Sequence, residues 1–324
     1  MYEFYKGRTR HNLLVRLSAC HYAALSPCDY KKARFVMWYR LYLCQRLISL
    51  FLLALLSFAT MATPITPPQR IVSINLCADE LLLLLADPQQ ISALTHLSQD
   101  EAASYFQTQA LAYPMTQGLA EEVLPFKPDL VIAGEYGGLQ TVHLLKKLGI
   151  RVETLPLANN MQQVFSNIEW IATLTGHPER GAEIIKTMQA RLAQLPAIEA
   201  NAPLAAVYDP NGYTVGAASL RGQSIRLAGW RNAGELAGVA DYGSLDLETM
   251  VRLQPDALID SPYTLNTYSR AEALAKHPAL RGLRLNPKII SIPSNRTICD
   301  GPWTIDTIET LVHERLTLLK RASE

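Results

Sequence analysis

The hydrophobic pattern of residues 70–156 alternates between short apolar runs and stretches of helical periodicity. Strand-like runs occupy residues 70–74, 91–95, 129–134 and 151–156. Helical patterns occupy residues 78–86 and 139–149, and the second of these ends at a glycine. The run "DLVIAG" at 129–134 is almost continuously apolar, as strands buried on both faces of a parallel sheet are. This succession of strands and helices predicts a doubly wound α/β lobe.

The pattern changes between Asn160 and Leu195, where only helical periodicity is present. Its second part is about 18 residues long, or about 27 Å as a helix, which is enough to connect two lobes. Strand patterns return at 204–209, 213–217, 256–261 and 288–293, with helical patterns at 224–230, 269–283 and 303–321. We therefore predict an α/β protein of two doubly wound lobes, with a ligand cleft between them. The predicted segments are a lobe at 63–158, a helical spine at 159–197 and a lobe at 198–324.

A local pattern recurs in both halves of the chain. "EEVLPFKPDLVIAG" begins at Glu121, and "LETMVRLQPDALIDS" contains Glu248. Each glutamate lies seven residues before a Pro-Asp pair that leads into an apolar strand pattern. The repeat favours two related lobes, and a chance similarity between two ordinary helix–strand junctions is the alternative.

The first 62 residues are predicted to be a leader. From Met37 the chain carries two arginines, then the apolar run Leu47–Phe58, then small residues at Ala59 and Ala62. This order is typical of a secretory signal peptide cleaved near Ala59 or Ala62. The apolar run is short for a membrane span, which needs about 20 residues. We expect a periplasmic protein whose true start is Met37, with residues 1–36 an extension; an uncleaved signal anchor is the alternative.

The charge is distributed unevenly between this leader and the rest of the chain. Residues 1–62 hold nine Lys or Arg and two acidic residues, a net charge of +7, whereas residues 63–324 have a net charge of −6. Phosphate backbones are bound by basic surfaces, so the mildly acidic body argues against a nucleic-acid partner.

With these features the chain resembles the class III periplasmic binding proteins of ABC importers, which capture ferric siderophores, haem or vitamin B12. The resemblance covers residues 68–320, and its most specific part is the block from Glu121 to Gly134. It implies a monomer that captures a metal chelate, either an iron chelate or a corrinoid, without an intrinsic cofactor. It also implies that Glu121 and Glu248 dock onto the membrane permease; the alternative is that both only stabilise helix N-termini.

Loops after the carboxyl ends of the strands are expected to line the cleft, because open parallel sheets bind ligands there. Aromatic rings, a few arginines and flexible glycines suit a large, flat, partly anionic ligand. The candidate ligand-binding residues are Asn75, Cys77, His96, Tyr136, Tyr213, Trp230, Arg231, Tyr263, Arg296, Cys299 and Trp303.

Of the five cysteines in the chain, Cys77 and Cys299 lie outside the leader. Two cysteines do not make a structural zinc site, which needs four ligands. In an oxidising compartment they could form a disulfide, provided that their Cα atoms lie within about 7 Å. Both follow strands that face the cleft, and a bond across it would hold it nearly shut. We favour two separate cysteines in the cleft wall, and the inter-lobe disulfide stays open as the alternative.

Three other function classes were weighed against transport. An exported enzyme could use Asp209, Asp300 or Glu135 as acid and base and Cys77 as nucleophile, but no histidine is placed beside them and no known catalytic motif is present. A protein that binds a free metal ion needs several clustered ligands, and only His96 is expected in the cleft. A regulatory or adhesion protein on the same scaffold is the third alternative. We predict that the chain is not an enzyme.

Overall fold

The computed structural model describes residues 37–46, 66–199, 201–263, 277–281 and 287–323. The chain divides into two compact units, residues 1–65 and 66–324. In the first unit residues 37–46 are helical and exposed, while the predicted apolar run and cleavage sites lie outside the described residues. No helix among the described residues combines the length and the apolarity that a membrane crossing requires.

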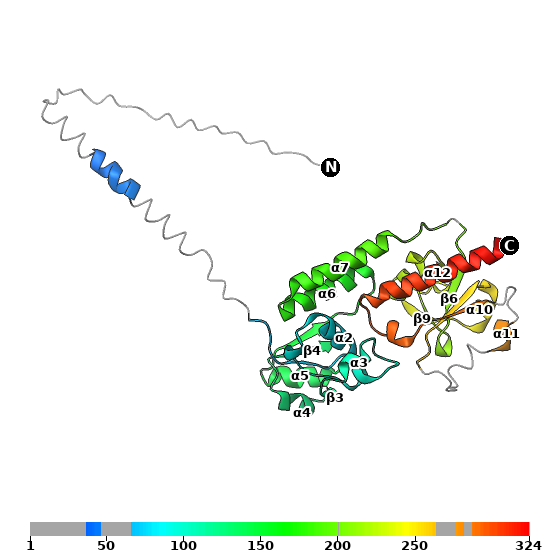
Figure 1. Cartoon of the computed structure of the whole chain (residues 1–324), viewed down its shortest axis with the longest axis horizontal. Helices are drawn as coiled ribbons and strands as arrows, with labels where there is room; N and C mark the ends of the chain where they lie inside the picture. The colour runs from blue at the N-terminus through cyan, green and yellow to red at the C-terminus, as the bar shows by residue number, and fades with distance from the viewer. Residues whose placement is uncertain (1–36, 47–65, 200, 264–276, 282–286, 324) are drawn as a thin grey trace, which may run out of the picture. The chain divides into compact units, whose positions relative to one another are not determined.

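A five-stranded sheet in the order β3-β2-β1-β4-β5 organises the N-terminal lobe of the second unit, and all its strand pairs are parallel (Figure 1). Its strands are β1 (Ile71–Ser73), β2 (Ile91–Thr95), β3 (Met115–Thr116), β4 (Leu130–Gly134) and β5 (Val152–Leu155). Its helices are α2 (Leu76–Leu85), α3 (Gln107–Ala110), α4 (Ala120–Val123) and α5 (Leu139–Lys147). The four strands expected from the hydrophobic pattern are present, and the two-residue β3 is too short to produce such a pattern.

The C-terminal lobe contains a four-stranded parallel sheet in the order β11-β10-β6-β8. Its strands are β6 (Leu204–Val207), β8 (Arg231–Asn232), β10 (Ala257–Asp260) and β11 (Lys288–Ser291). An antiparallel hairpin, β7 (Tyr213–Val215) with β9 (Tyr242–Ser244), lies outside this sheet. The helices are α8 (Leu220–Leu227), α9 (Ala233–Leu236), α10 (Leu247–Leu253) and α11 (Pro278–Arg281). Most of the helix expected at 269–283 lies outside the described residues.

The helix expected to begin at 224 and to include Trp230 is wrong at both ends. Helix α8 begins four residues earlier, because the side chain of Ser219 caps it by accepting a hydrogen bond from the Gly222 amide. It ends at Leu227, and the left-handed conformation of Gly229 (φ +82°) turns the chain into β8. Trp230 therefore precedes a strand.

Three long helices join the two lobes. Helix α6 (Met161–Thr175) packs against α7 (Pro178–Ala193), and α7 contacts α12 (Trp303–Ser323), as Figure 1 shows. The Arg191 guanidinium of α7 lies 2.6 Å from carboxylate oxygens of both Asp306 and Glu309 on α12. Helices were expected between Asn160 and Leu195. The contact of α12 with α7 was not expected, because it becomes apparent only in the folded chain.

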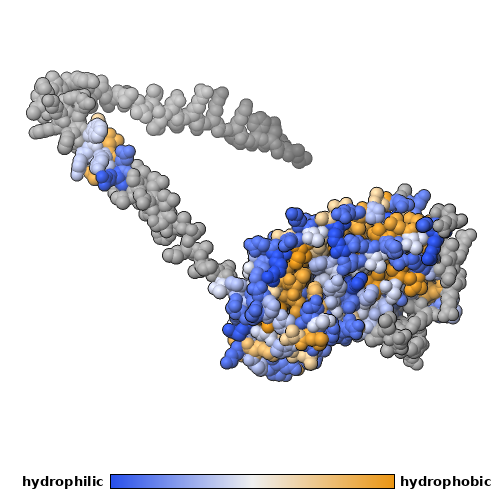
Figure 2. All heavy atoms as spheres, in the orientation of Figure 1, coloured by the Kyte–Doolittle hydropathy of each residue, from blue (hydrophilic) through white to orange (hydrophobic). Residues whose placement is uncertain are grey.

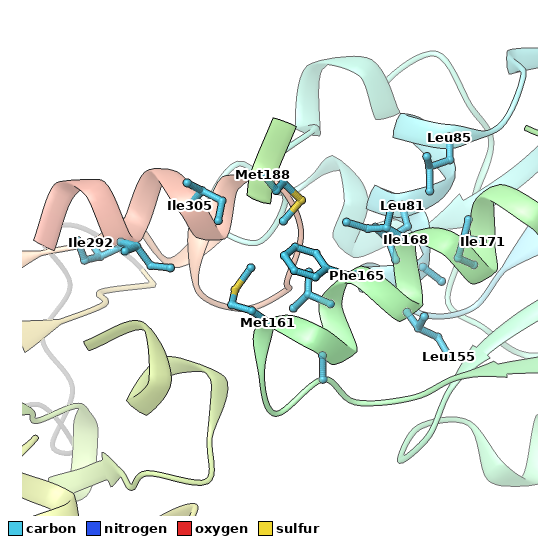
Figure 3. Packing of buried hydrophobic residues seen from close by; sticks show 14 of the residues in the cluster. Leu81, Leu85, Leu155, Met161, Phe165, Ile168, Ile171, Met188, Ile292 and Ile305 are labelled. Atoms are coloured by element: carbon cyan, nitrogen blue, oxygen red, sulfur yellow. The ribbon is translucent and has the colours of Figure 1, made fainter. Parts of the chain in front are cut away.

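Each sheet is buried on both faces, and one face of each contributes to a core shared by the lobes. In the N-terminal sheet Ile71 and Ile132 point into this shared core, whereas Val72 and Val131 point into a second core beneath α4 and α5. Strand residues of the C-terminal sheet, Val207 among them, belong to the shared core too. Figure 3 shows the residues of α6 and α7 that connect it: Met161, Phe165, Ile168 and Met188, between Leu81 and Leu85 on one side and Ile292 and Ile305 on the other. The long helices thus hold the lobes together by apolar packing.

The outer faces of these helices are mixed in character. Figure 2 shows apolar patches between polar side chains on the face of the second unit that carries α7 and α12. Helix α7 buries only Gly181 and Met188 fully, which fits a helix that covers the core with one narrow face.

The repeated Pro-Asp pattern has one structure in both lobes. The helix before it ends in a residue with left-handed φ, 47° in the first lobe and 50° in the second. The Asp129 carboxylate then accepts a hydrogen bond from the amide of Arg70, just before β1. The Asp256 carboxylate accepts one from the amide of Leu204 at the start of β6. In each lobe the aspartate ties the start of a buried strand to the start of its neighbour, so the repeat reflects a shared construction.

Candidate ligand-binding cleft

Two cavities lie at the carboxyl ends of the strands, one in each lobe. The C-lobe cavity has a volume of about 310 Å³ and is lined by residues at the ends of β6, β10 and β11 and by residues of α8 and α12. The N-lobe cavity has a volume of about 130 Å³ and is lined by the loops after β1, β4 and β5. Leu157 and Asp300 line both cavities, so the two adjoin there. We call them together the cleft.

A pair of stacked tyrosines forms part of the C-lobe cavity. The rings of Tyr213 on β7 and Tyr242 on β9 lie 6.2 Å apart and within 18° of parallel. Burial raises the pKa of both phenols. The pair therefore stays neutral at physiological pH and offers an aromatic face with two hydroxyl groups.

The same cavity contains two arginines. Arg221 on α8 forms an ion pair with Asp209, with 2.6 Å between guanidinium and carboxylate. The other terminal nitrogen of Arg221, Nη2, is buried and has no hydrogen-bond partner among the described residues. Arg296 lines the cavity from the loop after β11. Asp209 offsets the charge of Arg221, while its free N–H groups stay available to a bound molecule.

The remaining wall of the C-lobe cavity is mainly apolar. Leu157, Leu220, Ile225 and Ile298 line it, with Thr307 of α12 among the few polar groups. Such a surface can take up the apolar body of a ligand, while the tyrosines and arginines fix its orientation.

The N-lobe cavity is lined by two glycines and by polar and apolar side chains, Asn75, Leu81 and Tyr136 among them. Asn75 lines it but caps α2, since its side-chain oxygen accepts a hydrogen bond from the Ala78 amide at 3.0 Å. A Cβ atom at Gly134 would collide with the Asn75 side chain, which explains a glycine at the end of β4. Tyr136 lines this cavity with 76 % of its surface exposed. It is therefore free to lie against a bound molecule.

A disulfide between Cys77 and Cys299 connects the lobes, so the preference for two separate thiols is wrong. Their Cα atoms are 5.1 Å apart, within the range that a disulfide needs. The error came from treating the cleft as open along its whole length. In the folded chain loops of the two lobes meet at one flank, and we call this contact the seam. It is formed by Cys77 and residues 100–106 of the N-terminal lobe and by Tyr263 and residues 294–299 of the C-terminal lobe.

Several further contacts cross the seam. Tyr263 donates a hydrogen bond to the Asp100 carboxylate at 2.7 Å. Asn295 donates to the Glu101 carbonyl at 3.1 Å, and Ser294 donates to the Ala102 carbonyl. The disulfide is therefore one part of a wider contact that closes this flank of the cleft.

Three of the expected ligand-binding residues do not reach the cleft. Trp230 is only 2 % exposed, packs in the shared core and donates its indole N–H to the Leu311 carbonyl. Trp303 is 1 % exposed, stacks on Tyr105 and donates to the Cys299 carbonyl. Arg231 lines a separate cavity of about 310 Å³ near Trp230. These expectations are wrong because both indoles are used in the core and β8 is directed away from the cleft.

His96 and Tyr263 also lie outside both cavities, although each follows a strand whose carboxyl end faces the cleft. His96 begins a short 3-10 turn after β2. Tyr263 is occupied by its hydrogen bond to Asp100 in the seam. The structure thus places Asn75, Cys77 and Tyr136 in the N-lobe cavity, and Tyr213, Arg296 and Cys299 in the C-lobe cavity.

Arg221, Tyr242 and Asp300 line the cleft but are not among the ligand-binding residues expected from the sequence. Arg221 lies in α8, before the point at which a helix was expected, whereas the expected residues lie mainly in loops after strands. Tyr242 lies on β9, which reaches the cavity only because it pairs with β7. A linear pattern does not reveal this pairing, since the two strands are separated by α8, β8 and α9.

Within the described parts of the chain, no group of three or more His, Cys, Asp or Glu side chains is arranged to hold a metal ion. The polar groups of the cleft are phenols, guanidinium groups, serine and threonine hydroxyls, the Asn75 amide and single carboxylates. These groups form hydrogen bonds with a large solute but do not form a coordination shell.

A sequence profile of the family described as "Periplasmic binding protein" matches residues 71–286. A "Cobalamin-binding protein" of Halobacterium salinarum is 25% identical over 197 residues, which cover 59% of this chain and 53% of that protein. An "Uncharacterized ABC transporter substrate-binding lipoprotein YvrC" of Bacillus subtilis is 23% identical over 204 residues, covering 59% of this chain and 63% of that protein. The match therefore spans about half to two thirds of the length of these relatives.

Solved structures show the same fold. The periplasmic haem binding protein HutB of Vibrio cholerae superposes with a TM-score of 0.62 at 21% identity, covering 76% of this chain and 98% of that one. The periplasmic vitamin B12 binding protein BtuF of Vibrio cholerae has a TM-score of 0.57 at 17% identity, covering 78% and 99%. At these identities the likeness concerns the architecture of two lobes and a connecting helical layer.

Proposed function

The chain belongs to the periplasmic binding protein family, and we propose that it is the substrate-binding component of an ABC importer for a metal chelate. Members of this family bind solutes without transforming them, so the prediction that the chain is not an enzyme is confirmed. The proposed solutes are a ferric siderophore, haem or a cobalamin-type corrinoid. The name of the Halobacterium relative, and those of the haem and vitamin B12 binding proteins with the same fold, support this range.

One observation carries the proposal: the cavities of the two lobes meet at Leu157 and Asp300, at the carboxyl ends of both parallel sheets. A molecule placed there touches both lobes at once. The C-lobe cavity, at about 310 Å³, lies at the lower end of the usual range for ligand sites, about 300–1,000 Å³, and the N-lobe cavity adds to it.

We assign roles to the cleft residues as part of the proposal. Tyr213 and Tyr242 stack against the planar or apolar body of the chelate. Arg221 and Arg296 donate hydrogen bonds to its polar groups, and Tyr136 covers it from the N-terminal lobe. Asn75 and the Cys77–Cys299 disulfide shape the floor between them.

Binding is tested by isothermal titration calorimetry of the purified protein with cyanocobalamin, haemin and ferrichrome. At least one of them should bind with a dissociation constant below about 10 μM, or about −7 kcal/mol. Arg221→Met, which keeps the apolar stem but loses the donors, should weaken that binding. Arg231→Met is the matched control, because Arg231 lies at the separate cavity. If none of the three chelates binds, the proposed substrate range is wrong.

Docking to a permease is proposed to use Glu121 and Glu248. Both side chains are exposed, and each is the second residue of its helix, α4 or α10. One carboxylate per lobe can recognise two basic patches of a partner and so set its orientation. Lysine at both positions should abolish uptake in cells and leave chelate affinity unchanged. Glu122→Lys is a matched control beside Glu121. Loss of chelate affinity in the double variant contradicts the docking role.

The cellular setting is also a proposal. We propose that residues 1–62 form an export leader, that residues 63–158 and 198–324 form the two lobes, and that the exported protein is a periplasmic monomer. Mass spectrometry of the protein recovered from a periplasmic extract tests this, since its N-terminus should lie near residue 60 or 63. A first residue upstream of the apolar run Leu47–Phe58 contradicts cleavage.

A further inference from the structure

Asp300 lines both cavities, at the place where they adjoin. Its backbone is anchored on either side. The preceding residue, Cys299, is bonded to Cys77 of the other lobe, and the following residue, Gly301, packs so closely on the Trp303 ring that a Cβ atom there would collide with it. A side chain held in this way is preorganised toward whatever occupies the cleft.

The carboxyl group of Asp300 has one hydrogen-bond donor among the described residues, its own backbone amide. Among the described residues no other side chain donates a hydrogen bond to it, and no Lys, Arg or His forms an ion pair with it. Its electrostatic neighbours are a second carboxyl group, that of Glu80, and the phenol of Tyr242. Burial raises the pKa of Asp300 to about 7. A buried carboxyl group with a single backbone donor is incompletely hydrogen-bonded, so a further donor supplied by a bound molecule is favourable there.

The charge balance of the cleft points the same way. Arg221 is offset by its ion pair with Asp209, and Arg296 faces a cleft that also contains Asp300 and Glu135. The cleft therefore has no surplus of cationic groups. Above about pH 7, where Asp300 is ionised, a ligand carboxylate beside it would meet a like charge in a poorly solvated place, which raises the free energy of the complex. Affinities for the cleft are therefore compared in a buffer above that pH.

We propose that Asp300 determines specificity by accepting hydrogen bonds from N–H or O–H donors on the rim of an uncharged chelate, and that it discriminates against chelates bearing carboxylates. This inference rests on the proposed function and narrows it. The proposed ligand is uncharged, whereas the sequence led us to expect a partly anionic one. That expectation considered the arginines of the cleft but not the acidic groups that neutralise them.

The test measures the affinities of three probes by calorimetry. Cyanocobalamin has a rim of amide groups, ferrichrome is an uncharged ferric hydroxamate with peptide N–H groups, and haemin carries two propionates. The protein should bind cyanocobalamin or ferrichrome at least about tenfold more tightly than haemin, a difference of about 1.4 kcal/mol. Asp300→Asn should weaken the preferred uncharged probe about tenfold, because hydrogen bonds to charged groups are the stronger ones. The same substitution should leave haemin binding equal or tighter.

Asp241→Asn is the matched control. Asp241 interacts electrostatically with Tyr242, as Asp300 does, but it does not line either cavity. Its substitution should change each affinity less than about twofold. Thermal unfolding verifies that each variant is folded, and Asp300→Ser serves as a second variant if Asp300→Asn is not.

The outcomes separate this inference from the proposed function. Tighter binding of haemin than of both uncharged probes overturns the inference and leaves the proposed function standing. So does an equal loss for all three probes in Asp300→Asn, since that is the mark of a structural role. If none of the probes binds, the proposed function fails and the inference fails with it.

Discussion

Breaking the Cys77–Cys299 disulfide should lower the stability of the two-lobe unit substantially. The two cysteines are 222 residues apart, so the bond closes a loop that includes most of this unit. In the chain-entropy treatment, a crosslink over a loop of that length removes unfolded-state entropy worth about 5 kcal/mol at 25 °C. Measured losses for native disulfides are about 2–5 kcal/mol. We expect a loss of about 3–5 kcal/mol, or a fall in the unfolding temperature of about 10 °C.

The assay compares three samples by thermal unfolding followed by circular dichroism. They are the oxidised protein, the protein under a phosphine reductant, and the double variant Cys77→Ser with Cys299→Ser. The second and third samples should unfold at similar temperatures, both clearly below the first. The reductant added to the double variant is the control, and it should change nothing because the bond is already absent.

Two results would refute this reasoning. The first is the detection of two free thiols at Cys77 and Cys299 in denatured, unreduced protein, which would mean that the bond does not form. The second is an unchanged unfolding temperature in the double variant despite an intact bond in the wild type. That result would mean that residual structure in the unfolded chain leaves the bond little entropy to remove.

Three other perturbations test the energetics of the fold. Burial raises the pKa of Glu80 from 4.5 to about 8, so the folded protein retains a proton that the unfolded chain loses, and stability falls as the pH rises from about 4.5 to 8. Glu80→Gln should remove the part of this decline that is due to Glu80 and raise the unfolding free energy by a few kcal/mol at pH 8, with little change below pH 4.5. The measurement is the unfolding free energy in urea as a function of pH, and parallel curves for the two proteins would contradict the prediction. Arg191→Ala should cost no more than about 1 kcal/mol, because its ion pairs with α12 are partly exposed, and a double-mutant cycle with Asp306 measures the coupling. Gly229→Ala should cost about 1–3 kcal/mol, since φ is +82° there and a Cβ atom would lie 2.7 Å from the Arg315 guanidinium; an unchanged denaturation midpoint would show that Arg315 can move aside.

The elements with a strong hydrophobic pattern were the predictable part of the fold. Strand β4 could be placed because four adjacent apolar residues must be buried on both faces, and the parallel sheet does bury them. Helices α6 and α7 could be expected because their apolar residues recur with helical spacing over four turns each. The two-residue strands β3 and β8 could not, because two residues do not establish a periodicity.

The cleft was predictable only in outline. The rule that ligands bind beyond the carboxyl ends of strands pointed to Asn75, Tyr136 and Arg296, and these residues line the two cavities. It failed for Trp230 and Trp303, because a large indole can satisfy its N–H on a backbone carbonyl and be buried completely. Composition says how many aromatic residues are available but not which of them the core takes up.

Local residue order therefore determined the succession of strands and helices, the two related lobes and the helical segment between them. These depend on periodicity and on short-range motifs such as Pro-Asp after a helix, which act over a few residues. The tertiary structure alone decided that Cys77 meets Cys299, that Tyr242 stacks on Tyr213, and that Asp300 lies between two cavities without a side-chain donor. The first and third depend on how the two lobes close on their shared core, and the second depends on the pairing of β7 with β9 within the C-terminal lobe. All three join parts of the chain that local sequence patterns do not relate.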